Sequence, residues 1–120
     1  MLFHYQIKNY YVYSESADMR SGIDSLSGLV TNQLKLNPLR GDLFIFLNRR
    51  KTQLKLLHWQ GDGYAVFYKR LENGTYELPS LSSNLSGKIN AEQLLFMLQG
   101  VVLKTVQKRI RYSHNVVSKS

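Results

Sequence analysis

The chain has 120 residues, of which 43% are hydrophobic and 20% charged, a composition that fits one folded domain and argues against global disorder. Because it has no cysteine, disulfides and thiolate metal sites are excluded, and a reducing cytoplasm is the expected compartment. Sixteen Lys and Arg oppose eight Asp and Glu, and the resulting charge of +8 favours a polyanionic partner such as nucleic acid.

The first third of the chain predicts a strand followed by a helix. Residues 3–13 are rich in Tyr, Ile, Phe and Val, which is typical of a strand. From Met19 to Leu34 the apolar residues recur at helical spacing on one face. Pro38 cannot continue a helix, so this helix is expected to end near Asn37.

The middle of the chain predicts a hairpin with a basic turn. The run Leu43–Leu47 is almost wholly apolar, which is typical of a buried strand. A second strand is expected over Gln53–Trp59, with residues 49–52 as the connecting turn.

Two further strands are predicted downstream. Tyr64–Leu71 is entered through Gly61-Asp62-Gly63, where the glycines permit positive φ. Asn73-Gly74 is a strong hairpin sequence that would join this strand to another over Thr75–Leu78, which Pro79 ends.

The last part of the chain predicts a loop, a helix and a basic extension. Residues 80–88 are rich in Ser and Asn and are expected to be an exposed loop. Asn90 followed by Gln93 forms a capping box, and an apolar stripe after it predicts a helix of about 13–15 residues. We therefore expect one domain over residues 1–103 and a basic C-terminal extension over 104–120, partly disordered in the absence of a partner.

The order of elements is strand, helix, four strands, helix. Short links between successive strands favour antiparallel pairing. The expected fold is α+β, a single domain in which an antiparallel sheet of about four to five strands is packed on one face by two helices.

Catalytic groups are not clustered in this sequence. The acidic residues fall mostly at caps, turns and strand ends, and His4, His58 and His114 are isolated, so His58 is expected to lie in the core or at its rim. There is no phosphate-binding loop and no nucleophile elbow. The N-terminus lacks a signal-peptide pattern, and no apolar run reaches the ~18 residues of a membrane span. We expect no enzymatic activity, no cofactor, no metal and no membrane partner.

The cations are the better candidates for function. Arg49, Arg50 and Lys51 crowd the tip of the predicted hairpin, where they would repel one another without an anionic partner. Neighbouring strands contribute Lys55, Lys69 and Arg70, and in an antiparallel sheet these six are expected to share one face that binds phosphates. A second cluster on the C-terminal extension consists of Lys104, Lys108, Arg109 and Arg111.

Aromatic residues lie among these cations. Tyr64 and Tyr68 are candidates for stacking on unpaired bases. For Trp59 and Phe67 a core role is favoured over base stacking.

Three motifs carry a family resemblance. They are Asp18-Met19-Arg20, then Gly41-x-Leu43-Phe44-x-Phe46-x-Asn48-Arg49-Arg50, and then Leu54-Lys55-Leu56-Leu57-x-Trp59-x-Gly61-Asp62-Gly63. With them the chain resembles the TnpB accessory family of insertion-sequence (IS) family 66 elements, the product of the second open reading frame, over about residues 16–103. Two positions depart from the family pattern, because Gln60 and Val102 stand where its members usually carry Asp.

The resemblance implies an auxiliary role in transposition, beside a separate transposase that cuts and joins DNA. The expected function is a non-catalytic accessory protein of the bacterial cytoplasm, associated with the nucleoid when bound to DNA. Its expected partners are DNA, the transposase and other proteins of the same element. The residues leave open a protein–protein adaptor that binds the transposase without touching DNA, and a nuclease is the least favoured alternative.

Overall fold

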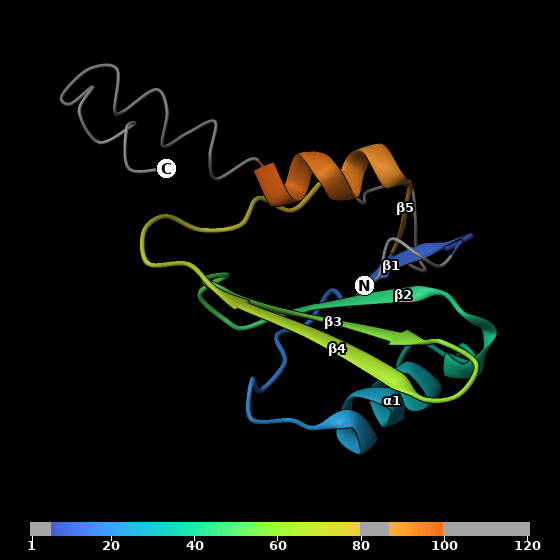
Figure 1. Cartoon of the computed structure of the whole chain (residues 1–120). Coiled ribbons are helices and arrows are strands. Elements are labelled where there is room, and N and C mark those ends of the chain that lie inside the picture. Colours follow the sequence, from blue (N-terminus) through green and yellow to red (C-terminus); the bar gives the residue numbers. More distant parts are fainter. Residues whose placement is uncertain (1–5, 80–86, 100–120) are drawn as a thin grey trace, which may run out of the picture.

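Five strands form one mixed sheet in the order β4-β3-β2-β1-β5 (Figure 1). The structure is a computed structural model that describes residues 6–79 and 87–99. The strands are β1 (Tyr10–Val12), β2 (Leu43–Leu47), β3 (Gln53–Trp59), β4 (Tyr64–Arg70) and β5 (Lys88–Ile89). The other elements are the helix α1 (Ile23–Asn32), a 3-10 turn η2 (Pro38–Arg40) and a second helix over residues 91–99.

Strand β2 lies at the centre of the sheet and is buried along its whole length. It pairs in parallel with β1 and antiparallel with β3. Its side chains alternate between two cores, with Ile45 in one and Phe44 and Phe46 in the other. Because both faces of the strand are covered, every position must be apolar, which explains the uninterrupted run of hydrophobic residues.

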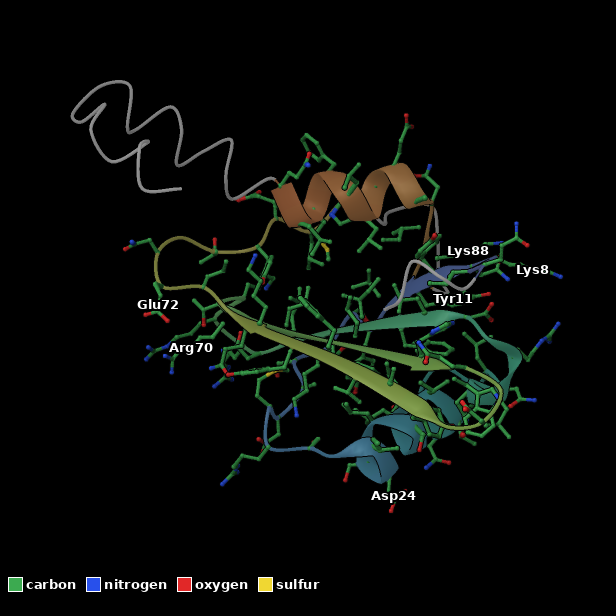
Figure 2. All side chains as sticks on the ribbon, viewed as in Figure 1. Lys8, Tyr11, Asp24, Arg70, Glu72 and Lys88 are labelled. Carbon is green, nitrogen blue, oxygen red and sulfur yellow. The ribbon has the colours of Figure 1, made fainter. Side chains whose placement is uncertain are left out.

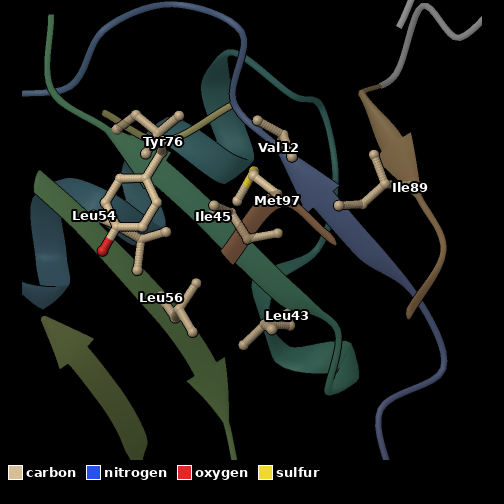
Figure 3. Close-up of a cluster of buried hydrophobic side chains, with 9 residues drawn as sticks. Val12, Leu43, Ile45, Leu54, Leu56, Tyr76, Ile89 and Met97 are labelled. Carbon is tan, nitrogen blue, oxygen red and sulfur yellow. The ribbon is translucent and has the colours of Figure 1, made fainter. Parts of the chain in front are cut away.

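The two helices cover opposite faces of the sheet (Figure 1). On the face that we call the α1 face, Leu26 and Val30 of α1 pack with Phe44 and Phe46. On the second-helix face, Met97 packs against a cluster shown in Figure 3. The residues of that cluster are Val12, Leu43, Ile45, Leu47, Leu54, Leu56, Tyr76, Ile89 and Met97.

The α+β class and the two helices of the prediction are confirmed, and four of its five strands are present as β1 to β4. β2 and β3 have the predicted bounds, and β4 ends one residue earlier than expected. The predicted capping box also forms, since Asn90 Oδ1 accepts from the Gln93 amide at 2.6 Å and Gln93 Oε1 accepts from the Asn90 amide at 2.9 Å.

Two predictions about packing are wrong. The sheet is mixed rather than antiparallel, because β1 runs parallel to β2. Short links between strands favour antiparallel pairing, but the link from β1 to β2 contains α1 and is long enough for the crossover that parallel strands require. The helices were expected on one face, but β2 buries both of its faces and therefore needs a layer on each side.

Three element assignments also differ. The first helix is shorter than predicted, since Gly22 is its N-cap and it ends at Asn32. Residues 75–78 form no strand, because the Tyr76 amide instead donates to the Lys51 carbonyl at 2.7 Å. β5 was not predicted, since two residues carry no periodicity. Of the predicted first strand over 3–13, only Tyr10–Val12 is a strand among the described residues, and Lys88 of the predicted loop belongs to β5. Residues 3–5, residues 80–86 of the loop and the C-terminal extension lie outside the described residues. Among the described residues, no helix has the length and apolarity that crossing a bilayer requires.

His58 is a buried polar group on β3. Its Nε2 lies 3.1 Å from the Gly41 carbonyl oxygen and its Nδ1 lies 3.4 Å from Gln60 Nε2. The neutral imidazole with its proton on Nε2 satisfies both contacts, since it donates to the carbonyl and accepts from the amide. Burial lowers the pKa of His58, against the smaller raising effects of the Gly41 carbonyl and the Asp42 charge.

The close approach of Gly87 to β1 generates a first prediction. Gly87 has φ +76°, its carbonyl accepts from the Val12 amide at 2.8 Å, and a Cβ there would overlap the Val12 carbonyl oxygen. We expect Gly87→Ala to lower the free energy of unfolding by about 2–4 kcal/mol, measured by urea denaturation. The matched control is Gly63→Ala, where a Cβ meets nothing within 4 Å. Equal losses in the two variants would contradict the prediction.

The environment of His58 generates a second prediction. Since its pKa is lowered by folding, the unfolded chain takes up a proton that the folded chain does not. The free energy of unfolding should therefore fall as the pH drops below about 6.5, until the folded imidazole also titrates. Urea denaturation from about pH 7.5 to 5 measures this slope, and NMR of the imidazole reports its titration.

Gln60→Asp supplies the comparison for that measurement. It places a carboxylate beside the imidazole, so the pKa of His58 should rise and the pH dependence should flatten. The same slope in both proteins would show that His58 is not its source.

Candidate nucleic-acid interface

The parallel pairing of β1 and β2 brings two distant segments together. After β1, the chain continues beside β2, with the Tyr13 amide donating to the Ile45 carbonyl at 2.9 Å and the Ala17 amide donating to the Leu47 carbonyl at 2.8 Å. Both segments therefore reach the same end of the sheet. There the loop of residues 18–20 meets the turn between β2 and β3.

These segments enclose an open polar groove of about 550 Å³, which we call the arginine groove. It contains three arginines, one from the loop after β1 and two from the β2–β3 turn. The residues that line it are Ala17, Asp18, Met19, Arg20, Asn48, Arg49, Arg50, Thr52 and Gln53. The motif Asp18-Met19-Arg20 and the Asn48-Arg49-Arg50 part of the second motif thus meet in space.

The side chain of Asn48 organises the β2–β3 turn. Its Oδ1 accepts from the amides of Thr52 at 2.8 Å and Gln53 at 2.9 Å, and its Nδ2 donates to the Thr52 hydroxyl at 3.1 Å. The turn also holds Lys51 at φ +59°, and the Lys51 carbonyl accepts from the Tyr76 amide. Arg49 and Arg50 therefore project from a fixed backbone, which reduces the entropy that a ligand must remove.

Asp18 and Arg20 form a forked ion pair at one wall of the groove. Arg20 Nε lies 3.1 Å from Asp18 Oδ1, and Arg20 Nη2 lies 2.7 Å from Oδ2. Hydrogen bonds from the side chain and the amide of Arg20 lower the pKa of Asp18 to about 2. The carboxylate is ionised at neutral pH, and it orients a guanidinium that is 90% exposed.

Arg49 and Arg50 carry the positive charge at the centre of this site. Within the described part of the chain, neither forms an ion pair with a carboxylate. Arg49 also borders a neighbouring hollow, together with Lys51 and Glu15. The structure therefore brings the predicted tip cations to one end of the sheet, and it adds Arg20 to them.

Lys55 lies farther along the α1 face and is half-buried. Its Nζ donates to the Ser21 carbonyl at 2.8 Å and lies 5.7 Å from the centre of the Tyr68 ring. The hydrogen bond to Ser21 connects the loop before α1 to the sheet. Lys55 thus has a structural role beside any contribution to the charge of the surface.

Lys69 and Arg70 separate onto different faces of the sheet. Lys69 pairs with Leu54, whose side chain lies in the second-helix core, so Lys69 points away from the α1 face. Arg70 lies on the α1 face and forms an ion pair with Glu72 at 3.2 Å (Figure 2). The prediction that all six cations share one face is therefore wrong for Lys69, because neighbouring positions on a strand alternate.

The four aromatic residues near these cations differ in burial and in packing. Trp59 and Tyr64 are half-buried and pack edge to face, with ring centres 5.0 Å apart. Phe67 packs against the second-helix core. Tyr68 is 49% exposed on the α1 face, where its hydroxyl donates to Gln53 Oε1 at 2.7 Å, so its ring is the most accessible of the four.

Arg20 is the member of the site that sequence reasoning missed as a candidate cation, although its motif was recognised. The parallel pairing that brings it to the β2–β3 turn was not predicted, so its position beside Arg49 had no basis in the sequence. Lys108, Arg109 and Arg111 lie outside the described residues. Over residues 6–79 and 87–99, no three His, Cys, Asp or Glu side chains gather as a metal site.

Comparison with known proteins gives one family. A family model described as IS66 Orf2 like protein matches residues 8–108. Two similar proteins come from Sinorhizobium fredii, and both carry the description of an uncharacterized protein. The protein y4hO is 40% identical over 84 residues, which cover 70% of this chain and 72% of y4hO. The protein y4jC is 26% identical over 98 residues, which cover 82% of this chain and 83% of y4jC. No solved structure matches this chain.

The hydrogen bonds of Asn48 generate a third prediction. Asn48→Ala removes all three side-chain contacts and leaves two amides without that acceptor, so the free energy of unfolding should fall by about 2–3 kcal/mol. Asn48→Asp keeps an acceptor for both amides and should lose less. Urea denaturation measures both changes. If the Ala and Asp variants lose equally, Oδ1 does not organise the turn.

Proposed function

The chain belongs to the IS66 Orf2-like family, and on this premise we propose that it assists transposition by contacting DNA through the arginine groove without catalysing strand cleavage. The family associates the protein with the transposition system of an insertion sequence. The observation that carries this proposal is the convergence of Arg20, Arg49 and Arg50 on one polar groove.

The charges around the groove support an anionic ligand. Five cations lie at the groove or on the α1 face beside it, and they are Arg20, Arg49, Arg50, Lys55 and Arg70. Asp18 and Glu72 pair with two of them. Arg49 and Arg50 form no such ion pair among the described residues, so their charge is available to a ligand. Arginine suits phosphate because its planar guanidinium donates two parallel hydrogen bonds.

The residues of the arginine groove suit the binding and positioning of DNA rather than catalysis. Arginine, asparagine and backbone amides hold phosphates, and they read backbone shape more than base sequence. We therefore propose that the protein holds DNA or a DNA–transposase complex at the nucleoid. Lys51, Lys69 and the C-terminal Lys108, Arg109 and Arg111 would add contacts outside the groove, since a long polyanion crosses more than one patch.

A fourth prediction tests this proposal with two pairs of substitutions that remove the same charge. The double variant Arg49→Gln/Arg50→Gln alters the groove. The double variant Lys8→Gln/Lys35→Gln removes two exposed cations that do not line it and that are not proposed to contact DNA. Fluorescence anisotropy on labelled duplex DNA over a series of salt concentrations should show weakened binding for the groove variant. The slope of log K against log salt is negative, and its magnitude should decrease by about 1.8, since each phosphate that the variant no longer neutralises accounts for about 0.9.

The outcomes separate three functions. Equal weakening in both double variants would mean that net charge alone attracts DNA, and it would remove the groove from the proposal. If the wild-type protein has no affinity for DNA at moderate salt but co-purifies with the transposase, the adaptor alternative replaces direct contact. Nicking of supercoiled DNA with magnesium or manganese, abolished in the groove variant, would contradict a non-catalytic role.

A further inference from the structure

We propose that β4 is a self-pairing edge, through which two copies of this chain join antiparallel strands about a two-fold axis into one continuous sheet. This inference concerns the assembly of the protein and does not depend on the proposed contact with DNA. It rests on the backbone amides and carbonyls of β4 that face away from β3, on the exposed side chains of that strand and on the complementarity of the strand with itself.

The alternation of hydrogen-bonded residues between β3 and β4 fixes which backbone groups of β4 face outward. The Gln60 amide donates to the Gly63 carbonyl and the Leu71 amide donates to the Thr52 carbonyl, both at 2.8 Å. In an antiparallel pair, hydrogen-bonded positions recur at every second residue, so the odd-numbered residues of β4 bond to β3. The amides and carbonyls of Tyr64, Val66, Tyr68 and Arg70 consequently point away from β3.

That outer edge is open among the described residues, since β4 ends the strand order and pairs only with β3 (Figure 1). The register with β3 is continuous over seven residue pairs, so no bulge twists the edge away. The segment has no proline, and its first five residues carry no charge. Val66 is 39% exposed and Tyr68 is 49% exposed, so apolar surface accompanies the open backbone groups. Edges of this kind are templates for another strand.

The sequence of β4 is complementary to itself in one register. With Phe67 on the two-fold axis, all seven residues of each copy are paired, and Val66 of one copy lies opposite Tyr68 of the other. Lys69 then faces Ala65, and Arg70 faces Tyr64, so no two cations are directly opposite each other. The same register places the exposed Asp62, in the turn before β4, opposite Glu72 and diagonally across from Arg70 of the second copy, and those two residues form an ion pair with each other.

The symmetry has a structural consequence. A two-fold axis that pairs antiparallel strands is perpendicular to the sheet, so the α1 faces of both copies lie on the same side. The two arginine grooves would then face the same way, at opposite ends of a ten-stranded sheet, since each copy contributes five strands. A second copy is favoured as the occupant because two β4 strands in this register match their outward amides with outward carbonyls and place no two cations opposite each other.

The first experiment measures mass. Sedimentation equilibrium of the full chain at about 0.1–1 mM, a range that suits a small interface, should show dimers of a 13.9 kDa chain. Each copy carries a charge of +8, so the dimer should tighten as salt screens the repulsion. DNA binding should weaken under the same change. These opposite responses keep a failure of the dimer distinct from a failure of the DNA proposal.

Two substitutions at Val66 form a matched pair. Val66→Pro removes an amide that points outward, without removing a bond to β3, and Val66→Thr keeps that amide and the branched side chain. The dimer dissociation constant should rise by about tenfold to a hundredfold in the proline variant, since it removes two symmetry-related hydrogen bonds, and should stay near wild type in the threonine variant. Val66→Lys, which keeps the backbone intact, should also weaken the dimer. A monomer at every concentration, or a dimer that both Val66→Pro and Val66→Lys leave unchanged, would overturn the proposal.

Crosslinking tests the register directly, because the chain has no cysteine of its own. Mixed under oxidising conditions, differently tagged Val66→Cys and Tyr68→Cys chains should form the mixed disulfide in excess over either symmetric one. Opposite residues of a hydrogen-bonded pair have Cα atoms about 5.5 Å apart, within the range for a disulfide. Predominance of a symmetric 66–66 or 68–68 product would overturn the register with Phe67 on the axis.

Discussion

The burial of β2 on both faces is the constraint on which the rest of this structure depends. An apolar strand of five residues cannot face water on either side, so a helical layer must cover each face. α1 supplies one layer and residues 91–99 supply the other. The chain meets this requirement by placing α1 between β1 and β2, and the long connection lets β1 lie parallel to β2.

The site follows from that parallel pairing. Parallel strands end at the same edge of a sheet, so the loop that follows β1 and the turn that follows β2 come together there. Asn48 fixes the turn through three side-chain hydrogen bonds, and Asp18 orients the guanidinium of Arg20. The arginines are therefore placed by the backbone before a ligand arrives. A polyanion would meet an ordered set of donors, which favours positioning of a nucleic acid over a loose attraction to net charge.

The same sheet separates two kinds of surface. The end of β2 carries the groove, whereas β4 offers an open edge with exposed Val66 and Tyr68. A two-fold assembly through β4 would present two grooves on one side of a continuous sheet, so one polyanion lying on that side could contact both grooves.

The sequence by itself determined the local features of this protein. The bounds of β2 and β3, the basic turn between them and the capping box at Asn90 are confirmed, because hydrophobic periodicity and turn chemistry act over a few residues. The positive charge that defines the candidate site was also evident in the composition.

Only the tertiary structure decided which distant segments meet. Arg20 lies beside Arg49 because β1 pairs in parallel with β2, and Lys69 points away from Arg70 because the register with β3 assigns them to opposite faces. Strand pairing between remote segments depends on how both faces of β2 are buried, and a shift of one residue would exchange the faces of a whole strand. No local pattern in the sequence contains that information, since it arises from packing of the complete sheet.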